Sequence, residues 1–221
     1  MVIQKRFILC FMIMYFFVSF SPAKAQNTRW RCIKNTNGIQ VYSKTMDSSK
    51  YRVIRVKTQL KTSLSSLVTL VSDAPNQISW VYLNRKAIVL KQKNAHSYIL
   101  YSQSNAPWPI TDRDVISSTE ISQDSITGIV SVDGIALPRY IPVSPHYVRV
   151  PYALSQWQFI PEKNGFVGVV YTLIIDVGGS IPRWLANLTM AKGPYQTMLG
   201  LRKEIKRKKY REAHLSLIKE P

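Results

Sequence analysis

The chain has 221 residues, 46% of them hydrophobic, and its 30 Lys and Arg against 12 Asp and Glu give a net charge of +18. This length fits one ordinary domain with a packed core, and so basic a chain usually meets nucleic acid or an anionic surface. Its two cysteines are Cys10 and Cys32. We expect Cys10 to be removed with a leader segment, which excludes an intrachain disulfide in the mature protein.

The first 25 residues have the pattern of a secretory signal peptide. Lys5 and Arg6 precede an apolar run from Phe7 to Phe20, and Ala23-Lys24-Ala25 closes the segment with small residues around a cleavage site. The run is short for a membrane span of about 20 residues, so a membrane anchor is the less favoured alternative. We therefore expect an exported protein, periplasmic or extracellular, with a domain at 26–212 and a C-terminal tail at 213–221. Lipid headgroups, rather than nucleic acid, are the anionic surface in that compartment.

The first half of the domain predicts two strands and then helices. The strands are expected at 38–44 and 51–60, joined by a polar turn around Asp47. A helix capped by Thr62 or Ser63 should continue to Val71, because leucines and valines fall on one face. A shorter amphipathic segment after Pro75 contains Trp80.

From residue 87 to residue 176 the pattern is one strand after another, which predicts an antiparallel sheet with hairpin connections. Turn-forming residues separate the candidates, which are 87–92, 97–103, 113–122, 127–136, 147–150, 154–160 and 166–176. Four prolines between Pro138 and Pro151 predict an extended loop there, since proline cannot donate to a sheet ladder.

Apolar residues recur at helical spacing from Ile181 to Ile205, and Gly193-Pro194 predicts a kink or a break in this helix. Its end, residues 202–211, is strongly basic, which suits either a helix C-terminus or an anionic membrane. A curved sheet with one apolar face needs a cover, and this helix is the only candidate that is large enough.

Four stretches resemble the START domain, the StAR-related lipid-transfer domain, in the order and at the spacing of that family. They are "GIQVYSK", "PWPITDRDVI", "YVRVPYALSQWQF" and "DVGGSIPRWLANL". The resemblance covers about Trp30 to Lys209. It implies an α+β helix-grip fold, in which a curved antiparallel β-sheet wraps around a long C-terminal α-helix. It also implies a tunnel that holds one sterol, phospholipid or related lipid, and no enzymatic activity.

The stretch "PWPITDRDVI" places Arg113 on one face of a strand and its neighbours Asp112 and Asp114 on the other. In the family the equivalent arginine points into the cavity and often pairs with an acidic residue, where this sequence has Lys86. We therefore hypothesise that Arg113 contacts an anionic or strongly polar headgroup. The alternative is that Asp112, Asp114 or a backbone carbonyl satisfies the guanidinium at the sheet edge.

Further candidates are aromatic or apolar residues on predicted inward faces and in the proline-rich loop. We expect some of the first group to line the cavity, although a plain core role is the alternative; they are Trp80, Tyr101, Trp157, Tyr171, Trp184 and Leu188. In the family the proline-rich loop covers the tunnel, so Ile141, Val143 and Tyr147 are candidate lid and membrane contacts. A passive edge loop is the alternative.

The sequence contains no recognisable metal or nucleophile motif, and we expect neither a metal nor a cofactor. Asp112 and Asp114 share a face and form a possible acid–base pair, but two carboxylates beside an arginine favour a structural network. We expect a monomeric lipid-binding protein for transfer or sensing. The alternatives are a helix-grip enzyme of the cyclase or hydrolase type that uses Asp112, Arg113 and Asp114, and a basic module that binds anionic envelope surfaces.

Overall fold

The computed structural model describes residues 29–45, 52–180 and 183–221, apart from the side chains of residues 45, 52 and 183–189. The predicted signal peptide and the turn at Asp47 lie outside the described residues. No helix within the described ranges is long and apolar enough to cross a membrane.

One antiparallel sheet dominates the described part of the chain, in the strand order β1-β2-β3-β10-β9-β7-β6-β5-β4. The short β8 lies off this path and pairs in parallel with β6, where Arg113 is opposite Val148. The strands are β1 (Arg31–Thr36), β2 (Ile39–Thr45), β3 (Arg52–Lys61), β4 (Asn84–Asn94), β5 (Ser97–Ser104), β6 (Arg113–Gln123), β7 (Val130–Ala136), β8 (Val148–Arg149), β9 (Tyr152–Pro161) and β10 (Phe166–Asp176).

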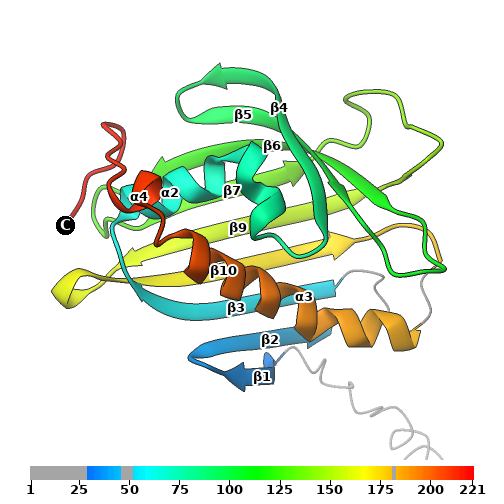
Figure 1. The fold of residues 1–221 in the computed structure, drawn as a ribbon, viewed down its shortest axis with the longest axis horizontal. Helices are drawn as coiled ribbons and strands as arrows, with labels where there is room; N and C mark the ends of the chain where they lie inside the picture. The colour runs from blue at the N-terminus through cyan, green and yellow to red at the C-terminus, as the bar shows by residue number, and fades with distance from the viewer. Residues whose placement is uncertain (1–28, 46–51, 181–182) are drawn as a thin grey trace, which may run out of the picture.

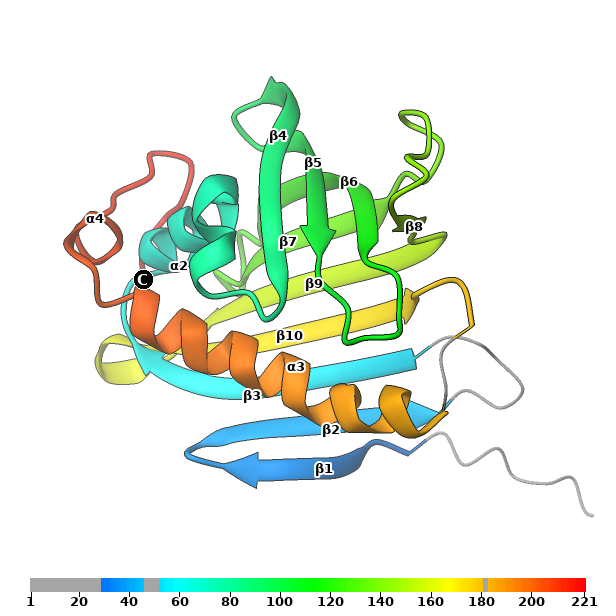
Figure 2. The same cartoon turned by 45° about the vertical axis from the view of Figure 1, so that its right-hand side comes forward.

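The helical segments lie against this sheet, except for α4, which contacts α2, and η3, which lies in the turn between β9 and β10. They are α2 (Leu64–Ser72), η2 (Ala74–Ser79), η3 (Lys163–Gly165), α3 (Arg183–Glu204) and α4 (Lys208–Arg211). The long α3 crosses in front of β10, β3 and β2 (Figure 1), and the turned view shows the β4–β6 part of the sheet rising beside it (Figure 2). This is the helix-grip arrangement, so the expected fold class is confirmed.

The helix α2 forms where its pattern and cap predict it. Ser63 has extended backbone angles and its hydroxyl accepts a hydrogen bond from the Ser66 N–H, as an N-cap does. Leu64, Leu67 and Val68 are buried in the core cluster because they fall on one face of the helix. Ser63, rather than Thr62, is therefore the cap.

The helix α3 continues through Pro194, so the predicted interruption is not a break. A proline at this position removes one backbone hydrogen bond from the helix interior, to the carbonyl of residue 190. Farther along, Gly200 lies against the backbone of Trp80: a Cβ added to Gly200 would lie 2.4 Å from the Trp80 carbonyl oxygen. Only glycine allows the helix to approach so closely.

Candidate functional site

A cavity of about 470 Å³ lies between the sheet, the segment that joins η2 to β4, and α3. This volume is within the range of small-molecule pockets, about 300–1,000 Å³. On the sheet side its wall consists of alternate residues, such as Val115 and Ser117 of β6 and Leu173 and Ile175 of β10. Alternation follows from the two-residue period of a strand, so one concave face of the sheet forms the wall.

Three of the predicted aromatic residues line this cavity, namely Trp80, Trp157 and Tyr171. Trp157 stacks on Tyr171 with ring centroids 4.2 Å apart, and Trp80 meets Trp157 edge-on at 6.0 Å. Burial raises the pKa of Tyr171 to about 12, because an ionised phenol would lose its hydration there. The cavity therefore has an aromatic wall with a protonated hydroxyl.

Arg113 also lines the cavity, on the same face of β6 as Val115. Its guanidinium donates to the carbonyls of Thr111 and, at 3.2 Å, of Gly178, while its Nε is buried without a hydrogen-bond partner in the described chain. Burial lowers the pKa of Arg113, and the nearby Asp112 opposes that change. The two alternatives for Arg113 thus each hold in part: it faces the cavity, and backbone carbonyls satisfy some of its donors.

The side chains of Arg113's acidic neighbours are engaged elsewhere. Asp114 is 1% exposed and forms a two-point ion pair with Arg149, with nitrogen–oxygen distances of 2.8 and 2.9 Å. Asp112 accepts a hydrogen bond from the Ala106 N–H and lies 3.7 Å from Arg85. Neither carboxylate is free for acid–base chemistry in the cavity.

The predicted cavity residue Tyr101 is not part of the lining, which takes Leu100 and Ser102 from the same strand. Its hydroxyl accepts a hydrogen bond from Gln103, and burial together with the nearby Asp114 raises its pKa. Adjacent residues of a strand face opposite ways, so Tyr101 belongs to the convex face. Lys86 stands where the family often has an acidic partner for the arginine, and it is exposed on β4.

The proline-rich loop lies over the convex face, because Arg149 holds it there. Besides Asp114, the Arg149 guanidinium donates to the carbonyls of Pro138, Ile141 and Pro142 at 2.8, 3.2 and 3.3 Å. The predicted lid residues Ile141, Val143 and Tyr147 are not among the residues that line the cavity. Val143 is 58% exposed, and the other two are half-buried.

The loop that does line the cavity joins β5 to β6. Asn105, Ala106, Pro107 and Ile110 contribute to the wall, and Trp108 between them is 91% exposed. On the helix side, Gly193, Pro194 and Thr197 of α3 complete the lining. The two remaining predicted residues, Trp184 and Leu188, lie on the first turns of α3, where the structure does not describe side chains.

The predictions missed four serines of the sheet wall, Ser102, Ser104, Ser117 and Ser155, and also Asn84. The sequence held one usable signal, because Ser117 has the same strand parity as Arg113 and Val115. A small polar residue on a strand is ordinarily assigned to the solvent face, which is why these residues were not proposed.

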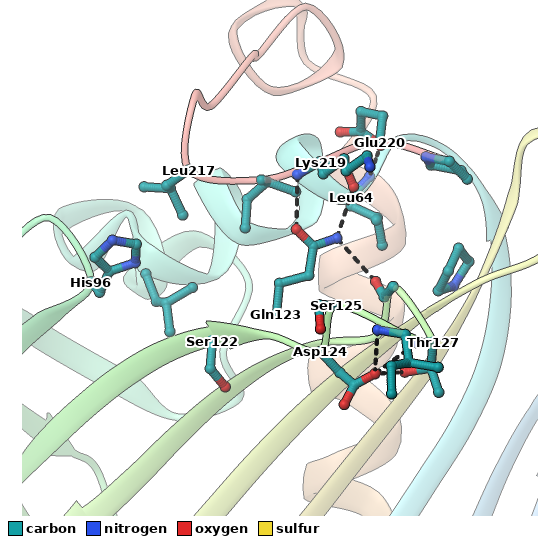
Figure 3. Close-up of a pocket in the computed structure, with 16 residues that line it drawn as sticks. Leu64, His96, Ser122, Gln123, Asp124, Ser125, Thr127, Leu217, Lys219 and Glu220 are labelled. Atoms are coloured by element: carbon teal, nitrogen blue, oxygen red, sulfur yellow. Dashed lines mark hydrogen bonds between the residues drawn. The ribbon is translucent and has the colours of Figure 1, made fainter.

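A second cleft, of about 630 Å³, lies beside the C-terminal tail and the turn between β6 and β7 (Figure 3). The Gln123 side chain exchanges hydrogen bonds with the backbone of Lys219, at 2.7 and 2.8 Å. The Glu220 carboxylate accepts from the N–H groups of Leu64 and Ser65 at 3.0 and 2.8 Å, at the N-terminus of α2. These polar groups bind the tail to the domain, so we assign this cleft a structural role.

The basic segment ends at α4, far along the molecule from the β5–β6 loop (Figures 1 and 2). Some of its charge is locally compensated: Arg207 pairs with Glu204 at 3.0 Å and Lys209 with Asp73 at 2.6 Å. Lys203 and Lys206 are exposed. Within the described residues, no group of three or more His, Cys, Asp and Glu side chains could hold a metal ion.

The fold defines a helix-grip protein with a cavity between its sheet and its long helix, and comparisons with known proteins identify the family. Residues 18–208 match the START domain family. The chain is 34% identical over 175 residues to the Pseudomonas aeruginosa protein PA1579. The aligned region covers 78% of this chain and 85% of that protein. The chain belongs to the START domain family, and it is therefore a lipid-binding domain.

Solved structures agree with this assignment. The crystal structure of a STAR-related lipid transfer protein from Xanthomonas axonopodis has 30% sequence identity and a TM-score of 0.74, over 80% of this chain and 99% of that one. Human StAR-related lipid transfer protein 5 has a TM-score of 0.72 at 14% identity, over 92% of this chain and 95% of that one, and it supports the fold alone.

Proposed function

We propose that this protein binds one amphiphilic lipid in the cavity between the sheet and α3 and moves it between membranes of the cell envelope. The main observation in support is the cavity of about 470 Å³, whose wall combines apolar and aromatic residues with the cationic Arg113. Removing apolar ligand surface from water contributes about 25 cal/mol per Å². The guanidinium would contact an acidic or strongly polar group of the ligand.

The β5–β6 loop is the segment that we assign to membrane contact. Trp108 is almost fully exposed while its neighbours line the cavity. Tryptophan is favoured at membrane interfaces because its ring is apolar and its N–H is polar. We keep Val143 of the proline-rich loop and the exposed lysines of α3 as secondary contacts with an anionic membrane.

Ligand exchange requires an opening, and the part of α3 around Gly193 and Pro194 is our candidate for the moving element. Both residues line the cavity, and the helix has one backbone hydrogen bond fewer there. A Gly193→Ala, Pro194→Ala double variant should exchange lipid more slowly between vesicles. An unchanged exchange rate would contradict this part of the proposal.

We propose no catalytic activity, since Asp112 and Asp114 are committed to other partners. The first test is native mass spectrometry of the mature protein purified from its own host, followed by extraction and identification of the lipid. A stoichiometric co-purified lipid supports a carrier. A protein that stays empty when it is offered mixed envelope lipids would contradict that function.

Export to the periplasm or beyond is part of the proposal and rests on the N-terminal sequence alone. Cell fractionation and N-terminal sequencing of the mature protein test it, with a start at Gln26 expected. The same purified protein, applied to vesicles with and without anionic lipid, tests the membrane contact. Trp108→Ala should lower vesicle binding, whereas an equal affinity would exclude this loop as the contact.

A further inference from the structure

Four serines lie on the sheet wall of the cavity, on three strands. Ser102 and Ser104 belong to β5, Ser117 to β6 and Ser155 to β9. The hydroxyl oxygens of these serines are not among the buried side-chain atoms of the described chain that lack a partner. A hydroxyl in a cavity wall can both donate and accept hydrogen bonds, so these groups can meet polar atoms of whatever fills the cavity.

Glycine at position 134 makes room for one of these hydroxyls. A Cβ at Gly134 would lie 2.5 Å from the Ser155 Oγ, too close for contact, whereas the Ser117 Oγ at 4.0 Å would be in ordinary contact. Ser155 pairs with Gly134 across β9 and β7. The bare backbone at this point therefore opens a polar patch in the middle of the wall.

The polar patch continues toward both ends of the cavity. Toward Arg113, the register of β5 and β6 sets Ser104 opposite Arg113 and Ser102 opposite Val115, the next residue on the same face. In the other direction, Ser155 is two residues from Trp157, which pairs with Tyr171. The serines thus form a hydroxyl track on the concave face of the sheet, between Arg113 and Tyr171.

The segment opposite the hydroxyl track adds two buried polar atoms without partners in the described chain. They are the Nε1–H of Trp80, whose side chain is 4% exposed, and the Oδ1 of Asn84. The Tyr171 hydroxyl, protonated at neutral pH, is a further donor. Residues that carry donors and acceptors therefore stand in the cavity wall on both sides, between its apolar residues.

We infer that the ligand is an oxygen-rich amphiphile, with an acidic group at Arg113 and hydroxyl, carbonyl or ether oxygens along its skeleton that meet the hydroxyl track. This inference rests on the proposed function and specifies the ligand class. A plain hydrocarbon chain would displace water from these polar groups without replacing its hydrogen bonds, which lowers affinity. An oxygenated skeleton restores those bonds, and sites of this kind discriminate strongly against analogues that lack the oxygen.

The cavity volume limits the size of this ligand. At roughly 30 Å³ for a water-sized group, and somewhat less for bonded atoms, which pack more closely, about 470 Å³ holds on the order of 16 to 20 non-hydrogen atoms. One functionalised chain or a small ring system fits that size. A phospholipid with two acyl chains does not.

The test compares two probes of equal carbon number. Palmitic acid and a dihydroxypalmitic acid, with hydroxyls at mid-chain and at the ω carbon, share the carboxylate for Arg113 and differ only in the skeleton oxygens. Titration calorimetry on the delipidated mature protein should give the dihydroxy acid an affinity about tenfold higher or more, since each added hydrogen bond contributes several-fold. Equal or tighter binding of palmitic acid would overturn the inference and leave the proposed function standing. Failure of both probes to bind would count against both.

A variant without the hydroxyl track sharpens the test. Ser117→Ala, Ser155→Ala, Tyr171→Phe should lose the preference for the dihydroxy acid and bind palmitic acid at least as well, which also shows that it is folded. Ser131→Ala on β7 is the matched control, because this serine does not line the cavity. A preference that survives in the triple variant refutes the inference. If the triple variant does not fold, the single Ser155→Ala variant should still reduce the preference about threefold.

Discussion

Replacing Gly200 by alanine tests the contact that sets the distance between α3 and the cavity's other wall. The added Cβ would lie 2.4 Å from the carbonyl oxygen of Trp80 and 2.9 Å from its Cα, whereas ordinary contacts begin near 3.4 Å. Both atoms belong to the backbone, so the helix must shift by about 1 Å. Overpacking of this kind costs about 1–3 kcal/mol. The better helix propensity of alanine returns about 1 kcal/mol.

We therefore expect Gly200→Ala to lower the free energy of unfolding by about 1 kcal/mol, measured by urea titration. Lipid should also dissociate faster from the variant, because Trp80 and Thr197 line the cavity on either side of this contact. Gly193→Ala is the control in the same helix for the stability measurement alone: its Cβ would lie 3.4 Å from the flexible ring of Tyr82, an ordinary contact. A Gly200→Ala protein more stable than the wild type would show that propensity alone acts there, and would refute the close approach.

Three further predictions concern acidic residues that pair with basic groups or backbone N–H groups. Asp114→Asn leaves the buried Arg149 without its carboxylate and should destabilise the fold by about 3–5 kcal/mol in chemical denaturation, whereas Asp112→Asn should cost less than about 1 kcal/mol; similar losses would contradict this. Glu220→Gln removes a negative charge from the N-terminus of α2. The variant should lose about 1 kcal/mol of folding stability, which a lower melting temperature would show. Burial opposes the ionisation of Asp73, but hydrogen bonds from α4 outweigh it and hold its pKa below the ordinary 3.8. The resulting stabilisation is present above pH 3.8 and is lost as the pH falls through the lowered value, so acid unfolding should be steeper in the wild type than in Asp73→Asn.

The fold was predictable where local pattern and global packing agree. Strands with alternating apolar residues and the capped helix α2 were found within a few residues of their ends. The strand β1 was missed because it lies at the sheet edge and all six of its side chains are exposed or half-buried, which leaves no apolar alternation to detect. The helix α3 passes through Pro194 because tertiary packing can override a local penalty.

The candidate site was harder to predict, since it depends on which face of each strand is concave. Tyr101 and Ile116 pair across β5 and β6 on the convex face, yet Ile116 is fully buried there. When both faces of a strand are covered, alternation no longer distinguishes inside from outside. Only the register shows that Leu100 and Ser117 share the concave face, so an aromatic residue was chosen where a serine lies.

The single guanidinium of Arg149 makes the proline-rich loop part of the cooperative core. A loop of this length is usually the first segment of a domain to be cut by proteases or to exchange its amide hydrogens. Here three of its carbonyls converge on a cation that is itself locked to the central sheet. The loop and the sheet should therefore unfold together. We expect local opening instead on the side of the molecule that carries Trp108 and the middle of α3.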